Sequence, residues 1–232
     1  MSDSIKYETS NQQGAKVSLK CSNLIDEIEA RAKAKIVWEC CPDIPGKMSA
    51  AIKDGVPTIQ YRERSEYGTL EELMHLQLMY SGVYLSSDTN DKYVQQAMTM
   101  LQNIVHHHVI FPTLIDLGGE PSINECVGIS KQLSQLEDSN DLERTSSDRK
   151  LEALMAIVYA RGQLDCGNDD TMAKLSDIYS KSALSNARRL GEEIASLIQL
   201  QADLSSHACR KTLAECLKRL GLTEDIKFTI LV

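Results

Sequence analysis

Apolar residues recur every three or four positions along most of this chain, and they alternate at strand spacing mainly in its first half. Asp54-Gly55 predicts a tight turn ahead of a strand, while Gly82 and Pro112 predict helix ends. The elements expected in this half are a helix over 17–34, strands over 35–40 and 57–63, and helices over 69–81 and from 91 to about 111.

The second half keeps the helical spacing and has no proline after Pro121. Gly191 marks a point where a long helix could bend, since glycine is a poor helix former. The elements expected here are helices over 150–160, 170–204 and 211–220, and a strand over 227–232.

These elements predict an α+β fold dominated by helices, with a small sheet in the first half and a helical second half. Residues 1–16 are polar and predict a flexible tail, followed by an α+β region over 17–133. Residues 134–149 are rich in Ser and Asp and predict a polar linker to a helical region over 150–232. If the C-terminal strand joins the N-terminal sheet, the two regions form one domain.

The composition is that of an ordinary globular protein. The chain has 232 residues, of which 42% are hydrophobic and 25% charged, and this balance excludes collagen-like and extensively disordered chains. Its formal net charge at pH 7 is −8, whereas proteins that bind the phosphate backbone gather Lys and Arg. We therefore do not expect a nucleic-acid partner.

The cysteines and the hydropathy indicate a compartment. The seven cysteines include no Cys-x-x-Cys pair, which favours free thiols in a reducing environment. No apolar run is long enough to span a bilayer, and the first residues lack the apolar core of a signal peptide. We expect a cytoplasmic protein without a membrane partner, and leave its oligomeric state open.

One short segment, Glu71-Glu72-Leu73-Met74-His75, carries a chemical pattern. Residues four apart share a helix face, so Glu71 and His75 could hold one metal ion between them. Glu72 then lies beside that face, as the general base does in the zinc-peptidase motif H-E-x-x-H. In such sites zinc lowers the pKa of a bound water and the glutamate accepts its proton. Here Glu71 replaces the first histidine of the motif.

The stretch from Asp54 to Tyr84 resembles zincin-like metallopeptidase domains of bacterial and phage proteins. In those domains an N-terminal helix and short strands lead to an edge strand, and then to a helix of the form H-E-L-x-H-x-x-L, often followed by glycine. The residues that carry the resemblance are Pro57, Thr58 and Ile59 in the strand, and Glu72, Leu73, His75, Leu78 and Gly82 in and after the helix. The resemblance covers residues 15–120 and implies a zinc ion and the hydrolysis of a peptide or protein.

A zinc site of this kind needs a third protein ligand, and the run from His106 to His108 offers candidates. Continuing the apolar stripe from Val105 directs His108 inward, with His107 second and His106 on the polar, solvated side. The expected site comprises Glu72 as general base and, as zinc ligands, Glu71, His75 and either His108 or His107, with Glu120 and Glu125 as further candidates.

The same residues also have an interpretation without metal. Thr69 and Glu72 match a capping box at the start of a helix, Glu71 complements the helix dipole, and His75 lies among apolar residues as a core histidine would. Three functions therefore stay open: an active zinc peptidase, a catalytically inactive zincin-fold binding or regulatory module, and a helical adaptor without a metal site.

Overall fold

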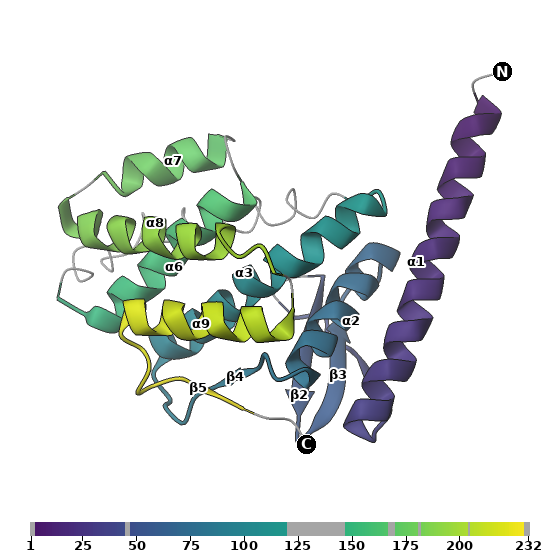
Figure 1. The fold of residues 1–232 in the computed structure, drawn as a ribbon, viewed down its shortest axis with the longest axis horizontal. Helices are drawn as coiled ribbons and strands as arrows, with labels where there is room; N and C mark the ends of the chain where they lie inside the picture. Colours follow the sequence, from purple (N-terminus) through teal and green to yellow (C-terminus); the bar gives the residue numbers. More distant parts are fainter. Residues whose placement is uncertain are drawn as a thin grey trace. The chain divides into compact units, whose positions relative to one another are not determined.

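The computed structural model describes residues 3–44, 47–119, 147–166, 170–180, 182–203 and 205–229. Its contacts divide the chain into two compact units. Unit 1 comprises 1–84, 110–119 and 230–232, and unit 2 comprises 85–109 and 120–229. The helices and small sheets of the described residues confirm a helix-dominated α+β fold (Figure 1).

Unit 1 is built from helices and one three-stranded sheet. In the order β1-β3-β2, β1 is parallel and β2 antiparallel to β3. The long helix α1 packs along α2, and α2 contacts β2. The elements are α1 (Asp3–Ala32), β1 (Val37–Cys40), β2 (Met48–Lys53), β3 (Val56–Tyr61), α2 (Glu66–Tyr80) and the end of α3 (Lys92–Asp116).

The sheet differs from the expected one in two ways. Asp54 and Gly55 have φ of 50° and 79°, which is the left-handed pair that a type I′ hairpin turn requires, so the predicted turn is confirmed. The strand before the turn, β2, was not predicted from the sequence. Because β2 occupies the outer position, β3 is the central strand and not the edge strand that the resemblance implied.

Helix α1 begins at Asp3, well before the expected start at residue 17. The predicted linker over 134–149 falls almost entirely on residues 134–146, which lie outside the described residues, as do Glu120 and Glu125. The linker therefore stays a prediction.

Helix α2 is capped by Ser65, whose hydroxyl accepts a hydrogen bond from the backbone N–H of Gly68 at 3.1 Å. Thr69 lies inside the helix, so the capping box on Thr69 and Glu72 was a wrong prediction. Gly82, with φ of 86°, follows the end of the helix as predicted.

Replacing Ser65 with alanine should therefore lower the free energy of unfolding by about 1 kcal/mol, because the Gly68 N–H loses its acceptor. Thr69→Ala is the matched control and should cost less, since the Thr69 hydroxyl makes only a long contact with the Met48 sulfur, at 3.9 Å. Urea unfolding of the two variants measures both. A larger loss for Thr69→Ala would contradict the observed helix start.

Unit 2 is a bundle of helices with a two-stranded sheet. Helix α8 packs closely on α6, and α9 packs on α8. The buried residues of α6 are apolar along most of the helix. The elements are β4 (Leu85–Ser86), the first part of α3, α6 (Arg149–Asp165), α7 (Asp170–Ile178), a 3-10 turn (Ser182–Leu184), α8 (Ser185–Gln199), α9 (Ser206–Leu220) and β5 (Lys227–Phe228).

One prediction for this half was wrong in the described residues, and one possibility left open by the sequence is not realised there. The helix expected over 170–204 is interrupted between Ile178 and Ser185, and Gly191 lies inside the later helix, α8. The C-terminal strand β5 pairs antiparallel with β4, within unit 2, and not with the three-stranded sheet.

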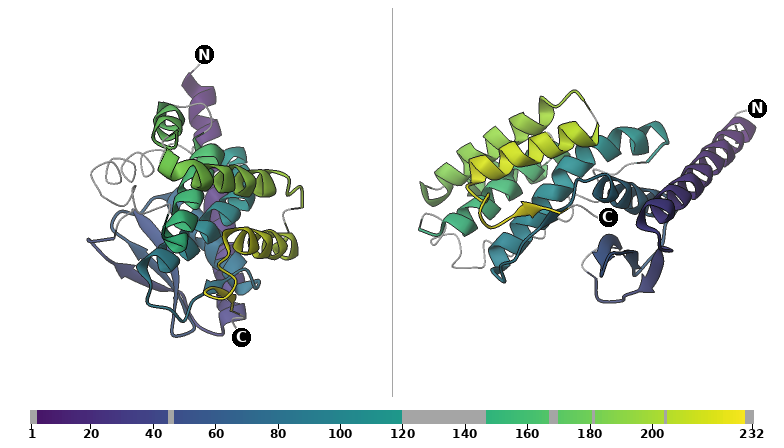
Figure 2. Two further views of the ribbon diagram at one scale, coloured as in Figure 1. Left: turned by 90° about the vertical axis from the view of Figure 1, so that its left-hand side faces the viewer. Right: turned by 60° about the horizontal axis from the view of Figure 1, so that its bottom comes forward.

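Helix α3 continues through Pro112, where the sequence predicted its end. A proline inside a helix removes one N–H bond, here to the carbonyl of His108, and need not end the helix. The helix ends at Asp116 and is followed by Gly118, which has φ of 85°, and the Gly119 N–H donates a hydrogen bond to the Leu114 carbonyl at 2.9 Å. Figures 1 and 2 show α3 as one uninterrupted ribbon.

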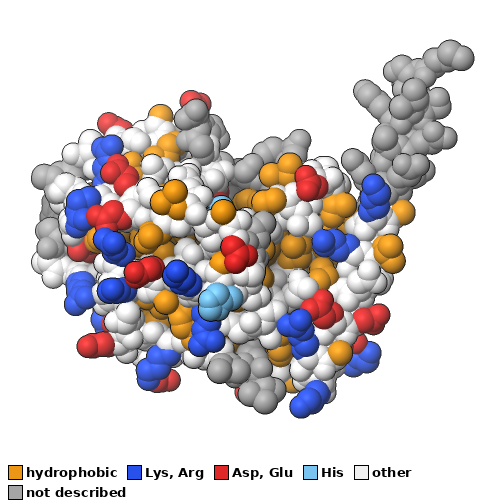
Figure 3. All heavy atoms as spheres, viewed as in Figure 1, with side chains coloured by type: hydrophobic (Ala, Val, Ile, Leu, Met, Phe, Trp, Pro, Cys, Tyr) orange, Lys and Arg blue, Asp and Glu red, His pale blue; other side chains and the backbone are white. Residues whose placement is uncertain are grey.

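Two further features of the molecule are the distribution of charged side chains on its surface and the hydropathy of its helices. On the face drawn in Figure 3, Lys and Arg side chains lie among those of Asp and Glu. Among the described residues, no helix combines the length and apolar character needed to cross a membrane.

Candidate metal centre

One face of α2 carries three side chains with polar ends. Tyr67, Glu71 and His75 are spaced four residues apart and so lie one above the other along the helix. His75 is buried, with 5% of its surface exposed, whereas Glu71 is half-buried. The helix therefore holds an imidazole and a carboxylate on one side, as the spacing predicts.

The end of α3 is held against this face inside unit 1. The hydroxyl of Tyr67 donates a hydrogen bond to the Leu117 carbonyl at 2.6 Å. Gly119 lies so close to the ring of Tyr67 that an added Cβ would be 2.9 Å from Tyr67 Cδ1. The division between the units falls after Val109, and α3 runs across it as one helix from Lys92 to Asp116.

Ligand atoms of Glu71, His75 and His107 all lie within 4.8 Å of one another. Two ligands of a tetrahedral zinc ion are about 3.4 Å apart, given bonds of about 2.0–2.2 Å, so small side-chain movements would bring the three atoms to that spacing. Two imidazoles and one carboxylate are a ligand set that zinc accepts with a fourth position open. This cluster could hold a metal ion.

The other two histidines of the run are placed elsewhere. Nε2 of His108 lies 2.9 Å from the Gln201 carbonyl, to which it is hydrogen-bonded, and His108 is not part of the cluster. His106 has no exposed surface, so its predicted solvated position was wrong. Residues 104–107 are all buried, so α3 has no solvated side at this point. The apolar stripe therefore could not tell which histidine points inward.

Glu72 points from α2 to the edge strand β2. Its Oε2 accepts a hydrogen bond from the backbone N–H of Ala50 at 2.6 Å. Burial, together with the neighbouring charge of Glu71, raises the pKa of Glu72 from 4.5 to about 8, although the Ala50 N–H acts in the opposite direction. The carboxyl is therefore mostly protonated at neutral pH, and it joins the helix to the sheet.

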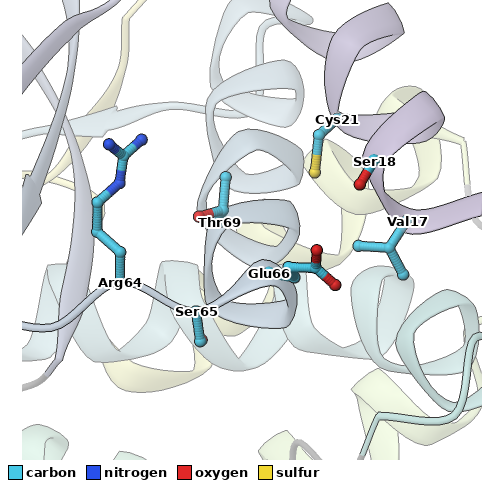
Figure 4. Close-up of a pocket in the computed structure, with 7 residues that line it drawn as sticks. All are labelled: Val17, Ser18, Cys21, Arg64, Ser65, Glu66 and Thr69. Carbon is cyan, nitrogen blue, oxygen red and sulfur yellow. The ribbon is translucent and has the colours of Figure 1, made fainter. Parts of the chain in front are cut away.

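A separate surface cavity of about 400 Å³ opens beside the start of α2 (Figure 4). Its one thiol is that of Cys21, and burial, with a smaller contribution from the charge of Glu66, raises the pKa of that thiol. A protonated thiol is a poor nucleophile, so the cavity shows no catalytic cysteine. Its lining residues are Val17, Ser18, Cys21, Arg64, Ser65, Glu66 and Thr69.

Sequence reasoning missed Asp165, which lies beside the ring of His107. Oδ2 of Asp165 is 3.7 Å from Nδ1 of His107, and the two side chains are each 4% exposed. No spacing rule connects residues so far apart in the chain, and only the packing of the helices reveals the pair.

Comparisons of this chain with protein-family models, with curated proteins and with solved structures gave no match.

Proposed function

We propose that this chain is a zincin-like metal-binding protein that holds a zinc ion on Glu71, His75 and His107 and uses it to hydrolyse peptide bonds. The observation that carries the proposal is the convergence of three ligand atoms within 4.8 Å. The resemblance of residues 54–84 to zincin-like domains supports zinc as the ion and a peptide or protein as the substrate. The free cysteines found in the described residues support the reducing cytosol as its location.

The chemistry follows from the number of ligands. Three protein ligands leave a fourth zinc position for water, and zinc lowers the pKa of that water to about 7. Glu71 is the least buried of the three ligands, so solvent and substrate would approach the ion from its side. Glu72 would be the general base, provided that it releases the N–H of Ala50 and its own proton.

The geometry of Glu72 favours a second candidate, a catalytically inactive zincin-fold binding or regulatory module. A general base must reach the reacting water and be unprotonated when it acts. Glu72 instead bonds the Ala50 N–H and has a raised pKa. In this candidate the ion is structural, and the helices of unit 2 offer the surface for a protein partner.

Zinc titration of the chain, purified without a histidine tag and stripped of metal, tests the site. We expect one equivalent to bind, and saturation at about 100 times Kd to add about 2.7 kcal/mol to the free energy of unfolding, or about 5–10 °C to the melting temperature. His75→Asn and Glu71→Gln should abolish this gain. His207→Asn, at an exposed position of α9, is the matched control and should leave it intact. A wild-type chain that binds no zinc would overturn both candidates.

Peptide hydrolysis separates the two candidates. The zinc-loaded chain is incubated with a mixture of peptides, and cleavage is followed by mass spectrometry with and without a chelator. Cleavage that the chelator stops would support the peptidase. Stoichiometric zinc without any cleavage would favour the inactive module.

A further inference from the structure

A buried row of charges in unit 2 leads to His107. Asp165 is the last residue of α6, and its Oδ2 lies 3.7 Å from Nδ1 of His107. Arg161, one turn earlier in α6, brings Nε to 3.6 Å from the same oxygen, with 13% of its side chain exposed. Arginine, carboxylate and imidazole thus follow one another in a region nearly closed to water.

The position of Asp165 is unfavourable for the helix that carries it. The C-terminal end of a helix has a partial negative charge and disfavours a carboxylate, and burying a carboxylate costs free energy unless it is paired. Arg161 offsets part of this cost, because it supplies a positive charge on the same side of α6. The neighbouring imidazole of His107 is a further polar group that faces this carboxylate.

We propose that Asp165 is a positioning residue for His107, an inference that rests on the proposed zinc site. A neutral imidazole carries its proton on one nitrogen and presents a lone pair on the other. With a carboxylate facing Nδ1, the proton is favoured on Nδ1, which leaves the lone pair of Nε2 as the one available to a metal ion. The separation of 3.7 Å exceeds that of a hydrogen bond, so the attraction in this structure is electrostatic.

The neighbouring histidine has a different environment. Nε2 of His108 faces a backbone carbonyl, that of Gln201, at 2.9 Å. A carbonyl at Nε2 favours the proton on that nitrogen and so opposes metal binding through it. The carboxylate of Asp165 thus lies beside His107, which belongs to the cluster, and not beside His108.

Zinc affinity tests the role of Asp165. In a competition titration with a chelating dye, we expect Asp165→Asn to weaken zinc binding by about 10–100-fold, the range found when outer partners of metal ligands are changed. The matched control is Asp177→Asn, at an exposed position of α7, and it should bind zinc as the wild type does. Unchanged affinity in Asp165→Asn, with zinc bound by the wild type, overturns this inference and leaves the zinc site standing. No zinc on the wild-type chain overturns both.

Nitrogen NMR of the metal-free wild-type chain gives a second readout that does not depend on how a variant folds. Long-range ¹H–¹⁵N spectra distinguish the two imidazole tautomers, and we expect His107 to carry its proton on Nδ1. In Asp165→Asn this preference should weaken, which a merely structural role of Asp165 would not produce. A proton on Nε2 of His107 in the wild type would overturn the inference.

Discussion

Replacing Gly191 with alanine should lower the free energy of unfolding by about 2 kcal/mol. Gly191 lies where α8 crosses α6, and an added Cβ would be 2.7 Å from the Ala156 carbonyl oxygen and 2.9 Å from Tyr159 Cβ. Overpacking of this kind costs about 3 kcal/mol, while the better helix propensity of alanine returns about 1 kcal/mol. Thermal unfolding should show a melting temperature about 4–8 °C lower.

Gly162→Ala, in α6, is the matched control. An added Cβ there would be 2.4 Å from Leu175 Cδ2, but this atom is the end of a flexible side chain and can move away. The gain in helix propensity should then offset most of the cost, leaving the stability close to that of the wild type. Equal losses in the two variants would contradict the close approach of α6 and α8 at Gly191.

Helical periodicity predicted most helices because apolar residues recur in them every three or four positions, but it could not predict where a helix is interrupted. Between α7 and α8 there is no proline or glycine to signal a break. The break begins at Tyr179, whose buried hydroxyl donates to the Met155 carbonyl at 2.6 Å and whose ring centroid lies 5.0 Å from that of Tyr159. The residue at the break thus makes tertiary contacts with α6. Such contacts cannot be predicted from the local sequence pattern.

Strand β2 was missed for a related reason. Half of its sequence, Met48–Lys53, consists of small residues, and two of these are alanines with low β propensity. The strand forms because the Asp54-Gly55 turn folds it back on β3, where Ala50 pairs with Ile59. The Asp54-Gly55 turn, which was predicted, thus implies a strand on each side of it, although the β propensity of residues 48–53 did not indicate one.

The candidate site was predictable where one helix supplies it. The four-residue spacing of Glu71 and His75 fixes a shared face without any tertiary information. The choice between His107 and His108 depended instead on which side of α3 is buried, and residues 104–107 are buried all around. The contact of Asp165 with His107 depends on the packing of two helices, and spacing rules cannot supply it.

Glu72→Gln should make the metal-free chain more stable at neutral pH, by about 3 kcal/mol at pH 7. The folded-state pKa of Glu72 is raised to about 8, above the ordinary value of 4.5. Its neutral form is therefore the one that favours the fold, fully below about pH 4.5, and this contribution is lost as pH rises towards 8, at about 1.4 kcal/mol per pH unit. Glutamine is neutral throughout, and its side-chain oxygen can still accept the Ala50 N–H.

Urea unfolding in the presence of a chelator, at pH 4.5, 7 and 8.5, measures this effect. The variant should match the wild type at pH 4.5 and exceed it increasingly as the pH rises. Glu66→Gln, an exposed position at the start of the same helix, is the control and should show no such trend. A Glu72→Gln variant that is no more stable at pH 8.5 than the wild type would show that the carboxyl is not held neutral in the fold.

The same variant then decides what Glu72 does in the zinc-loaded chain. If Glu72 is the general base, Glu72→Gln should abolish peptide cleavage while zinc binding stays intact. The variant's higher stability would then show that the carboxyl serves catalysis and destabilises the fold. Cleavage that persists in the stabilised variant would instead limit Glu72 to joining α2 to β2. The hydrogen bond from the Ala50 N–H to the side chain of residue 72 forms in both the wild type and the variant. Peptide cleavage and stability must therefore be measured on the same variant to distinguish a catalytic from a structural role of Glu72.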